Sequence, residues 1–200
     1  NGPDTLNVSS YTATGVFNTV AADTIQLGAG ANISGVQAEG NAAGTALDAD
    51  NLTIDSGSSV SMTVAQHNAF SGTVTAAGTE TISLTTAGDA TGFSVVEAYN
   101  LANGDQTFTL GADGQNVTTG SGAITVNTGT IADITDSVID GTNATTSLAI
   151  VLGATSDISD AVITGTSGSQ DANYSITLDG FDSTLTIAQN ALINSATGTN

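Results

Sequence analysis

The chain has 200 residues and carries 19 acidic side chains against no lysine or arginine, so its formal net charge is −19. A surface without fixed cations cannot bind phosphate, nucleic acid or an anionic membrane by direct charge pairing, and we expect none of these as partners. Each carboxylate must be solvated, hydrogen-bonded or neutralised from the medium, so dissolved metal ions are the first partner class that the sequence indicates.

The composition is that of a folded chain and not of an acidic tail. Charged residues make up 10% and hydrophobic residues 39% of the sequence, whereas disorder combines high charge with low hydrophobicity. The absence of cysteine excludes disulfides and thiolate metal sites. No apolar run is long enough to span a membrane. Because the chain opens without Met or a leader pattern, we expect residues 1–200 to be one repetitive segment of a longer or processed protein.

A short motif, apolar-x-apolar with small polar flanks, recurs from one end of the chain to the other. Its first members lie 16 to 30 residues apart, with a mean of about 24. The copies are Leu6/Val8, Ile25/Leu27, Leu52/Ile54, Ile82/Leu84, Phe108/Leu110, Ile124/Val126, Ile150/Leu152 and Ile176/Leu178.

Two further repeats support the same period. Residues 132–141 match residues 156–165, 24 positions later, and residues 62–66 match residues 185–189, which is about five periods away. Short strands joined by Gly, Asn, Asp and Ser at this period are typical of a parallel β-solenoid, here of about eight coils. Residues 64–70 and 94–101 are expected to form single helical turns on its outside.

The alternative fold is an antiparallel β-sandwich. Four dipeptides fit tight hairpin turns: Asn103-Gly104, Asp113-Gly114, Asp140-Gly141 and Asp179-Gly180. A sandwich gives no reason for one motif to return every 24 residues or so, and the repeat therefore favours the solenoid.

Asp and Asn gather at the expected turns, where they form a candidate calcium site. Stacked coils would bring equivalent aspartates to about 5 Å from one another, and calcium takes six to eight oxygen ligands. The candidate ligands are Asp133, Asp157, Asp136, Asp160, Asp113 and Asn116. The alternative is that these residues form Asx turns by bonding to their own backbone.

The sequence does not predict an enzyme. His67 is the only histidine, and without cysteine, a second histidine or an adjacent nucleophile pattern it cannot anchor a zinc site or a catalytic triad. Pairs of carboxylates can hydrolyse glycosides, but the chain has no tryptophan on which a sugar ring could stack. We expect His67 to have a surface role or to belong to a helical turn.

Three segments resemble the degenerate repeats of giant bacterial surface proteins, namely RTX-like adhesins, S-layer proteins and related extracellular filament proteins. These segments are Asp-Thr-Ile-Gln-Leu-Gly-Ala-Gly-Ala-Asn-Ile-Ser-Gly at 23–35, Gly-Ala-Ile-Thr-Val-Asn-Thr-Gly at 122–129 and Leu-Thr-Ile-Ala-Gln at 185–189. The resemblance implies an extracellular, cell-surface location, calcium-assisted assembly and a structural role. The strict Gly-Gly-x-Gly-x-Asp calcium repeat of RTX proteins is absent from this chain.

Two functions follow as hypotheses. The first is a structural protein that forms a layer or filament with further copies of itself or with adjoining repeats. The second is an adhesin stalk or binding module that engages a surface glycan or a neighbouring cell. Phe93, Tyr99 and Phe108 lie in the region with the most aromatic residues and are the candidate binding patch for that second function.

Overall fold

The fold is all-β. A computed structural model describes residues 4–17, 23–38, 44, 47, 49–153, 156–165, 173–177 and 183–184. Parallel strands stack into a β-solenoid of about seven turns, with almost no helix. Every pairing with a described register, β1 with β3 for example, is parallel. The predicted solenoid is therefore confirmed, and the antiparallel sandwich is excluded.

Contacts divide the chain into two compact units. Unit 1 comprises Asn1–Thr86 and Val95–Tyr99, and unit 2 comprises Ala87–Ser94 and Asn100–Asn200.

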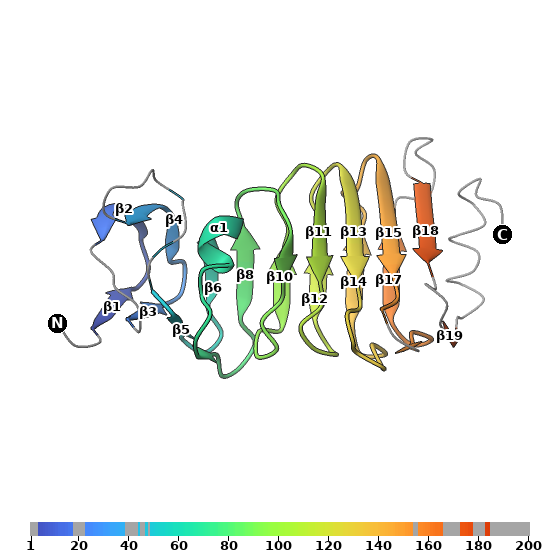
Figure 1. The fold of residues 1–200 in the computed structure, drawn as a ribbon, viewed down its shortest axis with the longest axis horizontal. Helices are drawn as coiled ribbons and strands as arrows, with labels where there is room; N and C mark the ends of the chain where they lie inside the picture. Colours follow the sequence, from blue (N-terminus) through green and yellow to red (C-terminus); the bar gives the residue numbers. More distant parts are fainter. Residues whose placement is uncertain are drawn as a thin grey trace. The chain divides into compact units, whose positions relative to one another are not determined.

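Unit 1 contains two parallel sheets. One has the strand order β1-β3-β5-β7, and the other has the order β2-β4-β6-β8 followed by β10 (Figure 1). Only the last residue of β10 is assigned to unit 2. The elements are β1 (Thr5–Val8), β2 (Thr12–Phe17), β3 (Thr24–Leu27), β4 (Asn32–Ala38), β5 (Asn51–Ile54), β6 (Ser59–Met62), α1 (Val64–His67), β7 (Val74–Thr75), β8 (Thr81–Leu84) and β10 (Ala98–Asn100).

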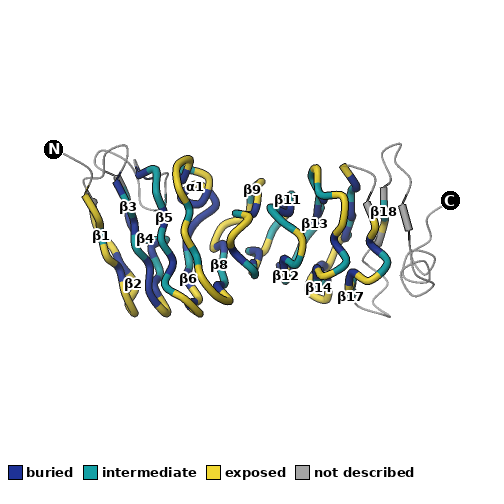
Figure 2. The backbone as a smooth tube through the Cα atoms, turned by 90° about the horizontal axis from the view of Figure 1, so that it is seen from below, coloured by how far each residue is buried: buried dark blue, intermediate teal, exposed yellow. Residues whose placement is uncertain are grey.

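The alternation of buried and outward-facing side chains explains why these segments form strands. In β3, Ile25 and Leu27 are fully buried, while Thr24 and Gln26 point outward. Ile25 pairs with Leu52 of β5 in the next turn, so that each apolar side chain lies over another. Exposed residues gather instead at the turns that join the strands (Figure 2).

The predicted helical turn at residues 64–70 is confirmed as α1. Thr63 caps it: its hydroxyl accepts the backbone N–H of Gln66, whose side chain in turn accepts the N–H of Thr63. The Gln66 amide also donates to the carbonyl of Ile33 at 2.7 Å, which ties the helix to the sheet.

The second predicted helical turn, at residues 94–101, is wrong. Ser94 and Val95 lie in a turn, and β10 follows as a strand. The N–H of Ala98 donates to the carbonyl of Glu80 at 3.1 Å, so the backbone of this segment bonds to the neighbouring turn and not to itself.

Unit 2 contains strands of three parallel sheets, in the orders β9-β11-β13-β15-β18, β12-β14-β17 and β16-β19. Its strands are β9 (Ala90–Thr91), β11 (Gln106–Thr109), β12 (Asn116–Thr118), β13 (Ala123–Asn127), β14 (Val138–Gly141), β15 (Ser147–Val151), β16 (Ser156–Asp157), β17 (Val162–Gly165), β18 (Asn173–Thr177) and β19 (Ser183–Thr184).

The 24-residue repeat in unit 2 is confirmed by strand register. Val138 pairs with Val162 and Ile139 pairs with Ile163, which aligns the two copies of the motif residue for residue. Ile150 pairs with Ile176, as the shorter motif predicts. Leu178 and residues 185–189 lie outside the described residues.

Part of the predicted register is wrong in unit 1, because the shorter motif occurs in both of its sheets and looks the same in each. Leu52 of β5 pairs with Val74 of β7, 22 residues on, and not with Ile82. Ile82 belongs to the other sheet, where it pairs with Val60.

Two of the predicted pairings between copies of the short motif in unit 2 are also wrong, each by two residues. Phe108 pairs with Val126, and Ile124 pairs with Leu148. Turns of unequal length absorb these differences, and the described chain makes about seven turns where eight were predicted.

Candidate functional site

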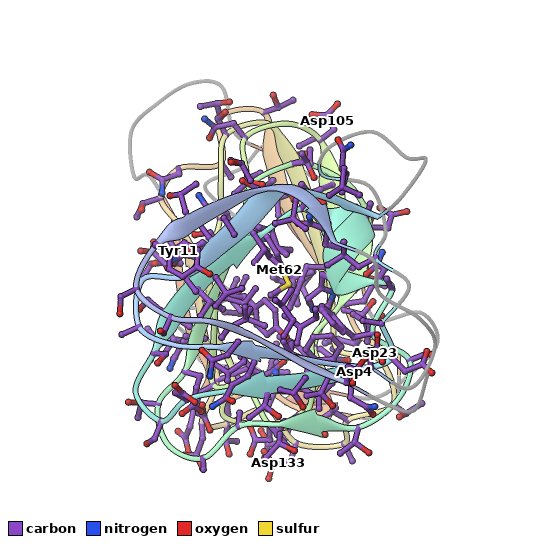
Figure 3. The ribbon with its side chains drawn as sticks, turned by 90° about the vertical axis from the view of Figure 1, so that its left-hand side faces the viewer. Asp4, Tyr11, Asp23, Met62, Asp105 and Asp133 are labelled. Atoms are coloured by element: carbon purple, nitrogen blue, oxygen red, sulfur yellow. The ribbon has the colours of Figure 1, made fainter. Side chains whose placement is uncertain are left out.

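Most of the described carboxylates lie at the turns and not on the strands. Among the described strand residues, only Asp140 and Asp157 are acidic, and the outward positions otherwise carry mainly Thr, Ser, Asn and Gln. In Figure 3 the labelled Asp4, Asp105 and Asp133 point away from the strands, whereas Met62 points into the interior. The turns therefore hold most of the negative charge.

Asp133 and Asp157 are paired in unit 2, as the repeat predicts. They form a parallel β-bridge between consecutive turns. The N–H of Ile134 donates to the carbonyl of Asp157, and the N–H of Asp157 donates to the carbonyl of Ala132, each at 3.1 Å. Bridged residues of this kind lie about 5 Å apart, and both side chains are exposed.

Each of these two carboxylates also closes an Asx turn. The N–H of Thr135 donates to Asp133 Oδ1 at 3.0 Å, and the N–H of Ser159 donates to Asp157 Oδ1 at 2.9 Å. The hydrogen bonds from the backbone and hydroxyl of Ser159 lower the pKa of Asp157, which keeps this carboxylate charged. The Asx-turn interpretation is confirmed for Asp133 and Asp157. Both carboxylates nevertheless remain exposed to solvent.

A second column of aspartates lies three residues further along the same two turns. The register of Val138 with Val162 places Asp136 and Asp160 at equivalent positions, and both are exposed. In the preceding turn, Asp113 Oδ1 accepts the N–H of Gly114 at 2.7 Å. A Cβ on Gly114 would lie 4.0 Å from the Cβ of Asp136, so Asp113 neighbours this column.

Asn116 does not belong to these turns. It begins β12 and pairs with Val138, with its side chain exposed on the sheet. Of the six candidate ligands, the structure thus places five at the acidic turns: Asp133 and Asp157 in one column, and Asp113, Asp136 and Asp160 near another.

The described carboxylates at these turns do not enclose a single ion. Within the ranges that the structure describes, no three acidic or histidine side chains converge as they would around a single metal. Exposed carboxylate pairs about 5 Å apart can still share a cation whose remaining oxygen ligands come from water or from another molecule.

Another group of aspartates joins consecutive turns, a role that the sequence analysis missed. Asp23 Oδ1 accepts the N–H of Asp4 at 2.9 Å in unit 1, and Asp105 Oδ1 accepts the N–H of Ala123 at 2.8 Å in unit 2. The signal in the sequence is an acidic residue just before a strand motif. These bonds explain how part of the charge is stabilised without any lysine or arginine.

Asp140 has a similar role on β14. Its Oδ1 accepts the N–H of Thr142 and the hydroxyl of Thr164, which lies in the next turn. Partial burial opposes the charged form, but the hydrogen bonds from Thr142 and Thr164 outweigh it and lower the pKa of Asp140.

The predicted aromatic binding patch is wrong for two of its three residues. Tyr99 is 0% exposed and Phe108 is 1% exposed, because both fill the core of their respective units. Phe93 is half-buried. The rings of Tyr99 and Phe108 are therefore not presented to a glycan.

His67 lies in α1, in agreement with the helical-turn expectation, but it is buried and not at the surface. Its ring packs edge-on against Tyr99 with the centroids 5.7 Å apart, and Nδ1 lies 3.1 Å from Asn68 Oδ1. Burial lowers the pKa of His67, although the bond with Asn68 opposes this. Its position indicates a packing role.

Comparison of the chain with protein-family models, with curated proteins and with solved structures finds no match. In the part of the chain that the structure describes, no helix has the length and apolar character needed to cross a membrane.

Proposed function

We propose that this chain is a non-enzymatic structural protein of the extracellular surface, and that its copies assemble through calcium ions held between their acidic turns. The observation that supports this proposal is the register of exposed aspartates in unit 2: Asp133 with Asp157, and Asp136 with Asp160. A column of carboxylates offers the same ligands at consecutive turns, so one copy can meet another along a short row of equivalent sites.

The charge distribution supports the same proposal. Two copies, each with a net charge of −19, repel one another, and a divalent cation between facing carboxylates removes that repulsion where it is strongest. The outward faces of β11 and β13, which carry Thr107, Thr109, Thr125 and Asn127, have no charge that contact would bury. The resemblance to S-layer and filament proteins agrees with this role.

The adhesin hypothesis depended on an exposed aromatic patch, but Tyr99 and Phe108 lie in the core. We therefore propose no glycan site.

Electron microscopy of the purified chain tests the proposal. In about 5–10 mM calcium, near saturation for weak extracellular sites, we expect filaments or sheets, and a chelator should return them to single molecules. Circular dichroism on the same samples should show an unchanged β signal. Single molecules in both conditions would contradict calcium-driven assembly.

A further inference from the structure

We infer that Glu80 and Glu97 form a calcium site inside unit 1, distinct from the acidic turns of unit 2. This inference does not rest on the proposed function, because an ion at this position would stabilise a single molecule whether or not copies assemble.

The first argument is the environment of Glu80, which precedes β8. Its side chain is 0% exposed. Oε1 accepts the N–H of Gly57 at 3.0 Å, whereas Oε2 is buried without a hydrogen-bond partner. A buried carboxylate with one unsatisfied oxygen is costly unless a cation or a proton compensates it. The chain has no lysine or arginine to supply that charge.

The second argument is that another carboxylate is held at the same corner. Glu97 Oε2 accepts the backbone N–H of Glu80 at 2.9 Å, and the N–H of Ala98 donates to the carbonyl of Glu80 at 3.1 Å. The sheet therefore fixes Glu97 one turn beyond Glu80. Two carboxylates at one corner repel each other unless positive charge lies between or beside them.

The third argument is a hydroxyl oxygen that lies near the Glu80 carboxylate, at Gly78. A Cβ at this position would lie 3.1 Å from Glu80 Oε1 and 2.5 Å from the Ser56 hydroxyl oxygen. These distances are too short for a side chain at residue 78, so the Ser56 hydroxyl and the Glu80 carboxylate both lie close to the Gly78 backbone. The backbone of Gly78 has a φ of +152°, which glycine adopts most readily.

The donor set selects the class of ion. Carboxylate and hydroxyl oxygens are hard ligands, and the site has no nitrogen or sulfur donor of the kind that zinc prefers. Calcium accepts irregular sets of six to eight oxygens, whereas magnesium requires a small, regular octahedron. Two carboxylates, a hydroxyl and water fit calcium better.

The test compares the wild-type chain with Glu80→Gln and with a matched control, Asp105→Asn. Asp105 is exposed and also accepts the N–H of the next turn, so the control removes one charge without touching the buried site. Thermal unfolding is followed in chelator, in about 5 mM calcium and in about 5 mM magnesium. Hydrogen exchange is followed at the N–H of Gly57, which donates to Glu80.

For a site with a Kd of about 0.1–1 mM, calcium should raise the unfolding midpoint of the wild type and of Asp105→Asn by about 3–8 °C, and magnesium should raise it less. Calcium should also slow exchange at Gly57. Glu80→Gln should lose both responses. Should Glu80→Gln fail to fold, Glu97→Gln retains the buried carboxylate and should show a weakened response to calcium.

Three results would overturn the inference. One is a full calcium response in both glutamate variants. Another is an equal response to magnesium in the wild type, which indicates general screening. The third is stabilisation of the wild type by acid with no effect of calcium on Gly57, which assigns the compensating charge to a proton.

Discussion

Asp133 and Asp157 are bridged backbone to backbone in consecutive turns, and each carboxylate accepts the N–H of the residue two positions ahead of it. The repeat thus sets two negative charges side by side, while local hydrogen bonds keep both side chains in the same conformation. Asp133 and Asp157 therefore both stabilise their own turns and present an exposed pair of charges.

Removing these two charges should abolish assembly without unfolding the chain. In the double variant Asp133→Asn/Asp157→Asn, the amide oxygen can still accept the N–H and keep the Asx turn. We expect a change in unfolding free energy below about 1 kcal/mol, together with loss of the calcium-dependent assemblies seen by electron microscopy.

The matched control is Asp89→Asn/Asp105→Asn, which makes the same change in net charge at two exposed aspartates of unit 2. It should assemble as the wild type does. Equal assembly of all three proteins would show that Asp133 and Asp157 do not hold the bridging ions.

Core packing in unit 2 should dominate its stability. Ile139 is fully buried in β14 between Val117 and Ile163 of the neighbouring turns. Ile139→Ala should lower the unfolding free energy by about 2–5 kcal/mol, measured by denaturant titration. Val162→Ala, at a side chain that is 51% exposed, should change it by less than about 0.5 kcal/mol. Similar losses in both variants would contradict the described alternation.

Gly120 should not tolerate a side chain. A Cβ at this position would lie 1.9 Å from the carbonyl oxygen of Ala102, so Gly120→Ala must push two turns of unit 2 apart. We expect a loss of about 1–3 kcal/mol in unfolding free energy. Thr130→Ala, in an exposed turn, serves as the control. A stable Gly120→Ala protein would show that these turns are not in the described register.

His67 should make unit 1 sensitive to mild acid. Its pKa is lowered by burial from the ordinary 6.5, so the unfolded chain binds a proton at a higher pH than the folded chain does. The stabilisation from His67 is complete above about pH 6.5 and falls below it, by at most about 1.4 kcal/mol per pH unit, until the folded pKa is reached.

The measurement is the difference in unfolding free energy between the wild type and His67→Gln at pH 7.5 and at pH 5.5. Acid also relieves carboxylate repulsion, but this effect is common to both proteins and cancels in the difference. The advantage of the wild type should shrink at the lower pH. A constant difference would show that His67 does not titrate on unfolding in this range.

The sequence predicts the class of fold because side-chain alternation and the 24-residue repeat both survive into the structure. The pairing of Asp133 with Asp157 follows directly from that repeat. The partner of Leu52 does not follow from the sequence, because both sheets of unit 1 use the same apolar-x-apolar pattern. Only the lengths of the turns decide which strand pairs with which.

The sites were harder to predict than the fold. Aromatic density near residue 100 marked core packing and not a surface, because a thin solenoid needs a few large side chains such as Tyr99 to fill its interior. The buried carboxylate of Glu80 has no sequence signal beyond its place before a strand motif. Its significance depends on which atoms surround it, and that requires the three-dimensional structure.

Sedimentation velocity in a calcium series at constant ionic strength tests the central claim most directly, because it separates bridging by calcium from general screening of the −19 charge. We predict that large species form as calcium rises to about 10 mM, do not form in sodium chloride of equal ionic strength, and dissociate in chelator. A single slowly sedimenting species throughout, or equal assembly in sodium chloride, would contradict the claim that calcium links the acidic turns of neighbouring copies.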